Sequence, residues 1–290
     1  MKWLADSFGI SRQALYKRQK TQSIKNNQEK ELIEMVRKLR KQNNKYGGKK
    51  LHHLLKEEME LKNIKMGRDK FYKFLRANYL LIPKHRNYHT TTNSNHRFYK
   101  HPNIVKDKVP TRPEQLWVSD ITYIKTENGH YYLALVTDAY SKKIVGYAID
   151  SHMKASLCVE ALKMAIKNRE YPELNLIHHS DRGFQYCSSE YTNFTLSNNI
   201  QLSMTEQYAP YENPVAERVN RTLKYEYALI NIIKNKKIAK QMVDYAVFQY
   251  NENRPHFSLK LFSPNYVHTH KNIKYKSYRK DKSNISLLNI

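Results

Sequence analysis

Three acidic side chains of this 290-residue chain stand at positions where a carboxylate could take part in chemistry. Asp120 is the only charged residue in the strand-like stretch QLWVSDITYI, although strand interiors disfavour aspartate. Asp181 follows the stretch LNLIHHS, which has the pattern of a buried strand, and α/β sheets usually bind ligands at such carboxyl ends. Glu217 lies in the helical stretch ENPVAERVNRTLKYE, with Lys224 two turns further along the same helix face.

Together, two strand-borne aspartates and a helix-borne glutamate can converge on hard divalent cations, which prefer oxygen ligands. Two such cations about 3.5–4 Å apart can activate a water or hydroxyl and stabilise the leaving oxygen when a phosphodiester is displaced. Each acid alone also fits an ordinary role: a salt bridge for Asp120, a helix cap for Asp181 and a favourable position in the helix dipole for Glu217. Spacing alone does not decide between these interpretations, because acidic residues are common.

The composition indicates an anionic partner. The chain has 51 Lys and Arg against 26 Asp and Glu, which gives a net charge of +25 spread along its whole length. A field of one sign over so much surface favours DNA or RNA, although a ribosome-associated or merely solubilised basic protein has the same composition. Metal ions would explain a cluster of three carboxylates in such a basic chain, because the ions would neutralise the negative charges. The surrounding lysines and arginines would then hold the nucleic acid.

The sequence disfavours membrane and secreted classes. No apolar run approaches the roughly 20 residues of a membrane span, and no amphipathic helix suggests binding to a membrane surface. Asp6 interrupts the opening stretch where a signal peptide would be apolar. Cys158 and Cys187 cannot by themselves build a disulfide framework or a zinc site. We therefore expect a cytoplasmic protein.

The elements that must position the three acids begin near Pro113. Three strand-like stretches with tight connections predict an antiparallel meander: QLWVSDITYI, HYYLALVTDAY and KIVGYAID. There follow a helix over KASLCVEALKMAIKNRE, a strand over LNLIHHS, a helix over SSEYTNFTLSNN, a short strand over QLSM and a helical stretch over 213–252. The order β-β-β-α-β-α-β-α predicts an α/β domain in which helices flank a mixed sheet.

A small all-α region is expected over residues 1–82. Residues 1–20 have the pattern of two short helices that turn at Gly9, with Ser11 as the cap of the second. This spacing fits a helix-turn-helix and an ordinary helical hairpin equally well. A third helix is expected over 27–43, and a helix pair follows over YGGKKLHHLLKEEM and GRDKFYKFLRANYLL.

The last helix of that region carries a basic face, formed by Arg68, Lys70, Lys73 and Arg76. Its clustered basic residues favour contact with DNA, and the alternative is a simple solvated face. Residues 83–113 are polar, basic and poor in periodic apolar positions, so we interpret them as a linker. Residues 114–235 then form the larger domain, and 236–290 form a C-terminal helix and a basic tail.

The residues around the three acids resemble a known family. The stretches WVSDITYI, VTDAYSKKIVGY, HSDRGFQY and AERVNRTLKYE are similar, in this order, to segments of the DDE transposases of bacterial insertion sequences. YNENRPHFSLKLFSPNYV resembles the segment after their catalytic core, and YGGKKLHHLL resembles the helix-turn-helix region before it. The similarity is strongest to the insertion-sequence-three type, whose gene is split over two reading frames. This chain resembles the second-frame product.

The resemblance implies a fold and a reaction. The catalytic core is expected to be RNase H-like, as it is in retroviral integrases. Asp120, Asp181 and Glu217 would bind two magnesium or manganese ions. The implied reaction cuts DNA at the ends of the element and joins the freed 3′ hydroxyl to another strand.

The resemblance also implies partners. Lys224, Asn213 and Arg182 are expected to contact DNA near the active site. The DNA would include the terminal inverted repeats of the element and the target, bound by a homo-oligomer at the nucleoid of a bacterial cell. The first-frame product of the same element is a further candidate partner. Two departures from the family pattern bear on recognition of the element ends: Tyr-Glu-Asn replaces Trp-Asp-Asn before the glutamate helix, and Arg221 stands where a glycine is frequent.

Two other functions stay open at this point. A non-catalytic regulator that binds DNA through helix-turn-helix segments would not need all three carboxylates. A tyrosine recombinase would use a covalent tyrosine with arginine and histidine, which HHSDRG and NRPHFS supply, and it would need no metal. Asp138, at the end of the second strand, fits a turn-forming role better than that of a fourth metal ligand.

Overall fold

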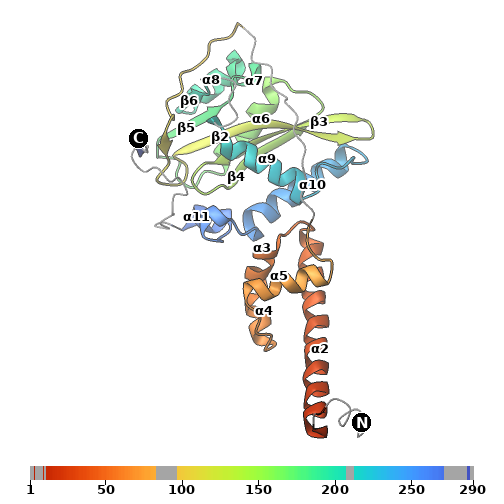
Figure 1. Ribbon diagram of the computed structural model, residues 1–290. Helices are drawn as coiled ribbons and strands as arrows, with labels where there is room; N and C mark the ends of the chain where they lie inside the picture. Colours follow the sequence, from red (N-terminus) through yellow and green to blue (C-terminus); the bar gives the residue numbers. More distant parts are fainter. Residues whose placement is uncertain are drawn as a thin grey trace. The chain divides into compact units, whose positions relative to one another are not determined.

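The computed structural model describes residues 3, 9, 11–82, 97–206, 212–270 and 286–287. The chain divides into two compact units, Met1–Lys84 and His85–Ile290, drawn in red to orange and in yellow to blue in Figure 1. Each unit has its own apolar core, so each is described by itself.

The first unit begins its regular structure with one long helix, α2 (Arg12–Gln42). Ser11 caps this helix as predicted, because its Oγ accepts the backbone N–H of Ala14. The prediction of separate helices over 11–19 and 27–43 is wrong: no Gly or Pro stands between them, so one helix runs through both. The short helix expected before Gly9 lies almost wholly outside the described residues.

The predicted helix pair of this unit is confirmed, with its first helix broken at Leu55. The pair consists of α3 (Gly48–Leu54), α4 (Lys56–Leu61) and α5 (Arg68–Ala77). These helices pack against the C-terminal half of α2 around a core of fully buried side chains that includes Leu32, Val36, Leu51, Phe71 and Leu75. The burial holds the basic helix α5 in a fixed place within the unit.

The second unit is built on a five-stranded mixed sheet, which confirms the predicted α/β class. The strand order is β4-β3-β2-β5-β6. The antiparallel strands are β2 (Leu116–Thr126), β3 (Gly129–Asp138) and β4 (Ile144–Asp150), and the strands parallel to β2 are β5 (Leu176–Ser180) and β6 (Ile200–Met204). This order of three antiparallel and two parallel strands is that of the RNase H-like fold.

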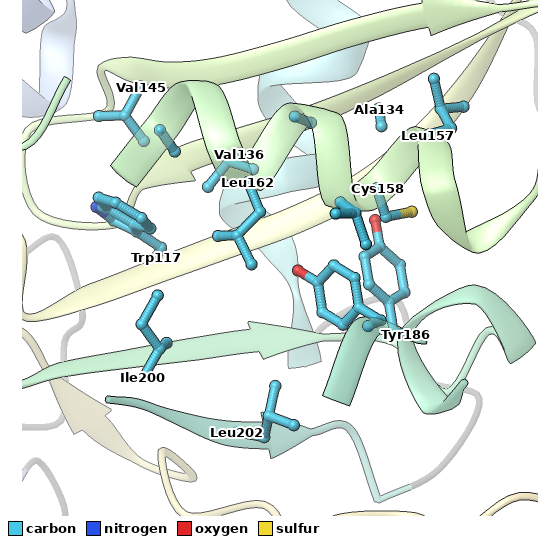
Figure 2. Close-up of a cluster of buried hydrophobic side chains, with 14 of the residues drawn as sticks. Trp117, Ala134, Val136, Val145, Leu157, Cys158, Leu162, Tyr186, Ile200 and Leu202 are labelled. Atoms are coloured by element: carbon cyan, nitrogen blue, oxygen red, sulfur yellow. The ribbon is translucent and has the colours of Figure 1, made fainter. Parts of the chain in front are cut away.

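Helices cover both faces of the sheet. One face carries α6 (Ala155–Lys167), α7 (Phe184–Cys187) and α8 (Ser189–Ser197), and the other carries α9 (Pro214–Glu226) and α10 (Lys236–Phe248). Figure 2 shows Trp117, Val136 and Leu162 filling the space between the sheet and α6. Ile124, on the opposite side of β2, packs under α9 and α10, as the alternation along this strand predicts.

Gly146 fixes the distance between the sheet and α6. A Cβ atom at this position of β4 would lie 2.2 Å from the carbonyl oxygen of Ala161. The strand and the helix therefore touch through their backbones, which only a glycine permits.

The helical stretch expected over 213–252 contains two helices with an irregular segment between them. Ala228, just after α9, has a left-handed φ of 61°, and α10 begins only at Lys236. Beyond α10 the chain forms a π-helical turn over Gln249–Asn253, a 3₁₀ turn over Phe257–Leu259 and the short helix α11 (Pro264–Thr269). The apolar face of α10 belongs to the same core as α9, so α10 is an integral part of the second unit.

The described half of the expected linker packs against the second unit. Residues 97–113 form only one short strand, β1 (Lys108–Val109), which pairs with β7 (Ser286–Leu287). The backbone N–H of Ile104 donates to Ser203 Oγ, and that of Met204 donates to the carbonyl of Pro102. Residues 83–96 lie outside the described residues, and within the described part no helix is long and apolar enough to cross a membrane.

Candidate active site

The register of the sheet brings Asp120, within β2, close to Asp181, just after the end of β5. The parallel strands β2 and β5 pair from Leu116↔Ile177 to Val118↔His179. Extending this register by two residues leads to Asp120 and Asp181. Strand β5 has ended by then, at Ser180, so the strands stop pairing where the two carboxylates begin.

Asp120 is held by the helix that carries the third acid. Its Oδ1 accepts the backbone N–H of Ile121, and its Oδ2 accepts the side-chain amide of Asn220 on α9 at 2.7 Å. Burial raises the pKa of Asp120 to about 7, and the negative charges of Asp181 and Glu217 add to this rise. The structure thus brings the three acids into one region, and in its described part no lysine or arginine forms an ion pair with Asp120.

Asp181 shapes the turn that leads from β5 into α7. Its Oδ1 accepts the backbone N–H of Gly183 at 3.0 Å, and a Cβ atom on Gly183 would lie 3.0 Å from that same oxygen. A glycine therefore lets the backbone close tightly around the carboxylate. Asp181 does not cap the following helix α8, because Ser188 caps it with its own Oγ.

Glu217 lies near the start of α9, whose first turn contains Pro214. Its side chain is exposed, and the partial burial of its carboxyl group raises its pKa. Asn220 and Lys224 follow at three and seven residues on the same helix face. The Lys224 ammonium lies 4.1 Å from the centre of the Tyr123 ring. Burial lowers the pKa of Lys224, and the negative charge of Asp120 offsets only part of this effect.

The other residues predicted to bind DNA differ in their exposure. Arg182 is half-buried beside Asp181. Asn213 is only 6% exposed, and its side-chain amide donates to the carbonyl of Ser119 at 2.9 Å. In the first unit, the side chains of three basic residues on α5 are exposed: Arg68, Lys70 and Lys73. Contact of these residues with DNA stays a prediction.

No ready-made metal cage is present in the described part of the chain. Among those residues, no three His, Cys, Asp or Glu side chains lie close enough together to hold a metal ion. The exposed Glu217 acts on Asp120 less strongly than Asp181 does. The donor set is nonetheless one that suits hard divalent cations, because all of its groups are oxygen ligands.

Comparison with known proteins identifies the family. Residues 110–210 and 198–264 match two profiles of the integrase core domain. The chain is 33% identical over 261 residues to the insertion element IS600 uncharacterized 31 kDa protein of Shigella sonnei, covering 89% of this chain and 94% of that protein. It is 37% identical over 123 residues, 42% of each chain, to the transposase InsF for insertion sequence IS3A of Escherichia coli.

The chain belongs to the DDE transposases of the insertion-sequence-three type. As a class, these proteins are polynucleotidyl transferases. The transposase is also similar to two viral structures: the HTLV-2 integrase catalytic core domain in complex with magnesium (18% identity, TM-score 0.45, 55% of this chain and 99% of that one), and a simian T-cell lymphotropic virus intasome (17% identity, TM-score 0.49, 81% and 79%).

Asp138 has the turn-forming role that the sequence favours. It is fully buried, and its Oδ1 accepts both the backbone N–H and the hydroxyl of Ser141, at 2.6 and 2.7 Å. Its Oδ2 accepts the backbone N–H of Glu114 at 2.7 Å. The carboxylate is thereby occupied on both oxygens, which leaves no place for it as a fourth metal ligand.

His178 and Arg254, two of the residues that a tyrosine recombinase could use, have structural roles in this transposase. His178 is buried, and its Nε2 lies 2.6 Å from Ser119 Oγ and 3.1 Å from the hydroxyl of Tyr191. Burial lowers the pKa of His178 to about 3, with a further contribution from His179, so the ring is neutral. Arg254 is held by two hydrogen bonds of 2.7 Å to Glu226.

Sequence reasoning missed the supporting residues around the acids. Tyr123 lies under Lys224, and Ser119 and Tyr191 contact His178, but none of the three has a signal for this role in its type or spacing. Asn220 was detectable, because it falls one helical turn after Glu217 and faces the same way. Its contact with Asp120 depends on the distance between α9 and β2, which the sequence does not contain.

Proposed function

We propose that this transposase cuts DNA at the ends of its insertion element and transfers the freed 3′ end to another strand, using Asp120, Asp181 and Glu217 as ligands for two magnesium or manganese ions. When bound, the two cations would activate the attacking oxygen and stabilise the leaving oxygen. The observation that carries the proposal is that the charges of both Asp181 and Glu217 act on the buried carboxyl group of Asp120, beside the point where β5 ends.

The surroundings of the acids support this assignment. The Asn220 bond to Asp120 ties α9 to β2 and so keeps the helix that carries Glu217 beside Asp120. The raised pKa of Asp120 reflects carboxylates that burial and mutual repulsion make costly to ionise, and divalent cations would relieve that repulsion. Glu217 would join the other two acids by rotation of its exposed side chain.

The basic residues near the acids would hold the DNA backbone. Lys224 keeps its position over the Tyr123 ring, and Arg182 directly follows the second aspartate. Both side chains would contact phosphates, which fix the position of DNA without reading its sequence. Asn213 would support the DNA-contacting side chains rather than contact the phosphates itself, since its side-chain amide is already bonded to the carbonyl of Ser119 on β2.

We assign separate roles to the parts of the chain. Residues 1–82 would bind DNA, with the exposed basic face of α5 on the phosphate backbone, and residues 83–113 would connect them to the catalytic core over 114–235. The C-terminal helix and basic tail over 236–290 would add non-specific affinity. The DNA would be the terminal inverted repeats and the target, bound by a homo-oligomer at the nucleoid, with the first-frame product as a further partner.

The proposal is tested with labelled DNA that carries one element end. We expect the full chain to nick and join this DNA with Mg²⁺ or Mn²⁺, and to be inactive in EDTA. Asp120→Asn should reduce joining at least a thousandfold, whereas Glu160→Gln, an exposed acid paired with Lys163 on α6, should leave it unchanged. DNA binding without any cutting would support a regulator, and metal-independent cutting with a protein–DNA adduct would support a tyrosine recombinase.

A further inference from the structure

Two asparagine side chains beside Asp120 each have an oxygen atom without a protein partner. Asn220 donates its side-chain N–H to Asp120 Oδ2 at 2.7 Å, and Asn213 donates to the carbonyl of Ser119, the residue before Asp120, at 2.9 Å. Each asparagine is only 6% exposed. In the part of the chain that the structure describes, neither Oδ1 atom has a hydrogen-bond partner.

The chemistry of the acceptors fixes the orientation of both amides. With a cation bound, the Asp120 carboxylate is ionised and, like a main-chain carbonyl, can only accept hydrogen bonds, so the NH₂ group of each asparagine must face its acceptor. Rotation of either amide by 180° would place oxygen against oxygen. The unpartnered Oδ1 atoms are therefore a consequence of the contacts that the two asparagines make, and buried oxygens of this kind require a donor.

Asn213 bonds to β2 instead of capping its own helix, α9. It stands at the N-cap position of α9, where an asparagine side chain usually accepts a backbone N–H of the first turn. No such bond forms here, and the side chain reaches across to β2. The two asparagines thus join the helix that carries Glu217 to the strand that carries Asp120, at two successive residues of that strand.

We infer that Asn213 and Asn220 are outer-sphere ligands, which accept hydrogen bonds from the hydration water of a divalent cation held by Asp120 and Asp181. This inference rests on the proposed function. The two terminal atoms of an amide share one carbon, so Asn220 Oδ1 lies within a few ångströms of the Asp120 carboxylate. Magnesium gives up its water reluctantly and usually keeps several molecules when protein carboxylates bind it, so the waters need acceptors of this type.

Binding of Mn²⁺ to the full chain tests the inference without an activity assay. Electron paramagnetic resonance of the free ion gives the affinity for the wild type, Asn220→Ala and Asn213→Ala. We expect each variant to bind Mn²⁺ about tenfold more weakly or worse, as substitution of outer-sphere partners generally does. Asn198→Ala is the matched control, because its amide also donates to a main-chain carbonyl but at the end of α8, and it should bind as the wild type does.

A second probe separates the acceptor role from simple positioning of Asp120. Cobalt(III) hexaammine keeps its six ammonia ligands and can bind only through their N–H groups, so it reports outer-sphere contacts alone. Calorimetry with this ion should show the same weakening in Asn220→Ala. If Mn²⁺ binding falls but cobalt hexaammine binding does not, Asn220 only orients the carboxylate, and the inference is wrong.

The remaining outcomes distinguish this inference from the proposed function. If the wild type binds Mn²⁺, Asp120→Asn abolishes binding and Asn220→Ala binds as the wild type does, the outer-sphere role fails and the metal site stands. If the wild type does not bind Mn²⁺, or Asp120→Asn binds it equally well, the proposed metal site itself fails. Circular dichroism and a thermal melt check folding, and Asn220→Ala decides the question should Asn213→Ala not fold.

Discussion

Asp120 has a carboxyl group that the fold makes difficult to ionise. Burial raises its pKa from 3.8 to about 7, and the neighbouring charge of Asp181 contributes to the rise. A pKa that is higher in the folded state means that the folded protein retains a proton that the unfolded chain loses. The metal-free protein should therefore lose stability as the pH rises from about 4 to about 7, the reverse of the usual effect of a paired aspartate.

Replacement of the Asp120 carboxylate should abolish DNA joining but make the metal-free protein more stable. Asn at position 120 cannot ionise and can still accept the hydrogen bond of Asn220. We expect Asp120→Asn to raise the free energy of unfolding of the metal-free protein at pH 7.5 by on the order of 1 kcal/mol, after allowance for solvent screening. Urea denaturation in EDTA measures this difference, which should shrink at pH 5.

A half-buried aspartate at the end of β4 provides the control for this experiment. The pKa of Asp150 is lowered, first by the backbone N–H of Ser151 and then by Lys236, so its ionised form is favoured in the folded state. Asp150→Asn should therefore leave stability unchanged or reduce it slightly. A loss of stability in Asp120→Asn as well would contradict the view that burial and repulsion act on Asp120.

At the scale of elements, a buried ionic cluster attaches the C-terminal helix α11 to the catalytic sheet. His268 on α11 is fully buried, and its ring nitrogens lie 3.5 Å from Glu114, 3.8 Å from Asp138 and 2.9 Å from Ser141 Oγ. Burial alone would lower the pKa of His268, but the two carboxylates outweigh it and raise the pKa to about 9. The helix is therefore held by a charged histidine between two buried acids.

This cluster predicts a loss of stability in alkaline solution. The folded pKa of about 9 lies above the unfolded value of 6.5, so the contribution of His268 is complete below pH 6.5 and disappears as the pH rises through 9. His268→Asn should lower the free energy of unfolding at pH 7 by about 3 kcal/mol, because it removes the buried cation between Asp138 and Glu114 and leaves Glu114 with Arg169 alone. Thermal melts between pH 6 and 10 should show a steep fall for the wild type and a flatter profile for the variant; equal slopes would refute this role.

Element boundaries were the part of the fold that the sequence predicted least well. The two predicted helices at the N-terminus are one, because nothing in the chain between them breaks a helix. Within the helical stretch expected over 213–252, α9 ends at Glu226 and Ala228 is left-handed, although its residue type gives no such signal. Both cases concern where an element begins or ends, and packing decides that more than local preference does.

At the scale of the whole molecule, the charge of +25 makes the affinity for DNA a property of many residues. Each phosphate that a lysine or arginine neutralises releases counterions, so affinity falls steeply as salt rises. The basic side chains of the first unit and those around the acids of the second would both contribute. The two contributions can be separated. The basic side chains of the first unit should affect DNA binding alone, whereas those around the acids should affect both binding and catalysis.

A triple substitution on α5 tests this separation. Alanine at Arg68, Lys70 and Lys73 should weaken binding to all DNA sequences and reduce the slope of log affinity against log salt by up to about 0.9 for each phosphate that is no longer neutralised. Joining at saturating DNA should not change. Fluorescence anisotropy over a range of salt concentrations measures the slope, with Lys163→Ala on α6 as the control. An unaltered slope in the triple variant would remove α5 from the DNA-binding surface.

The sequence by itself determined the strands, the helices that flank them and the three acids in family order, because hydrophobic periodicity and short motifs are local properties of the chain. It also predicted the turn at Asp138, since an aspartate that binds the backbone a few residues on needs no distant partner. Only the tertiary structure decided which side chains meet Asp120. The bonds of Asn220, Asn213 and His268 join segments about a hundred residues apart, and such contacts follow from the packing of α9 and α11 on the sheet.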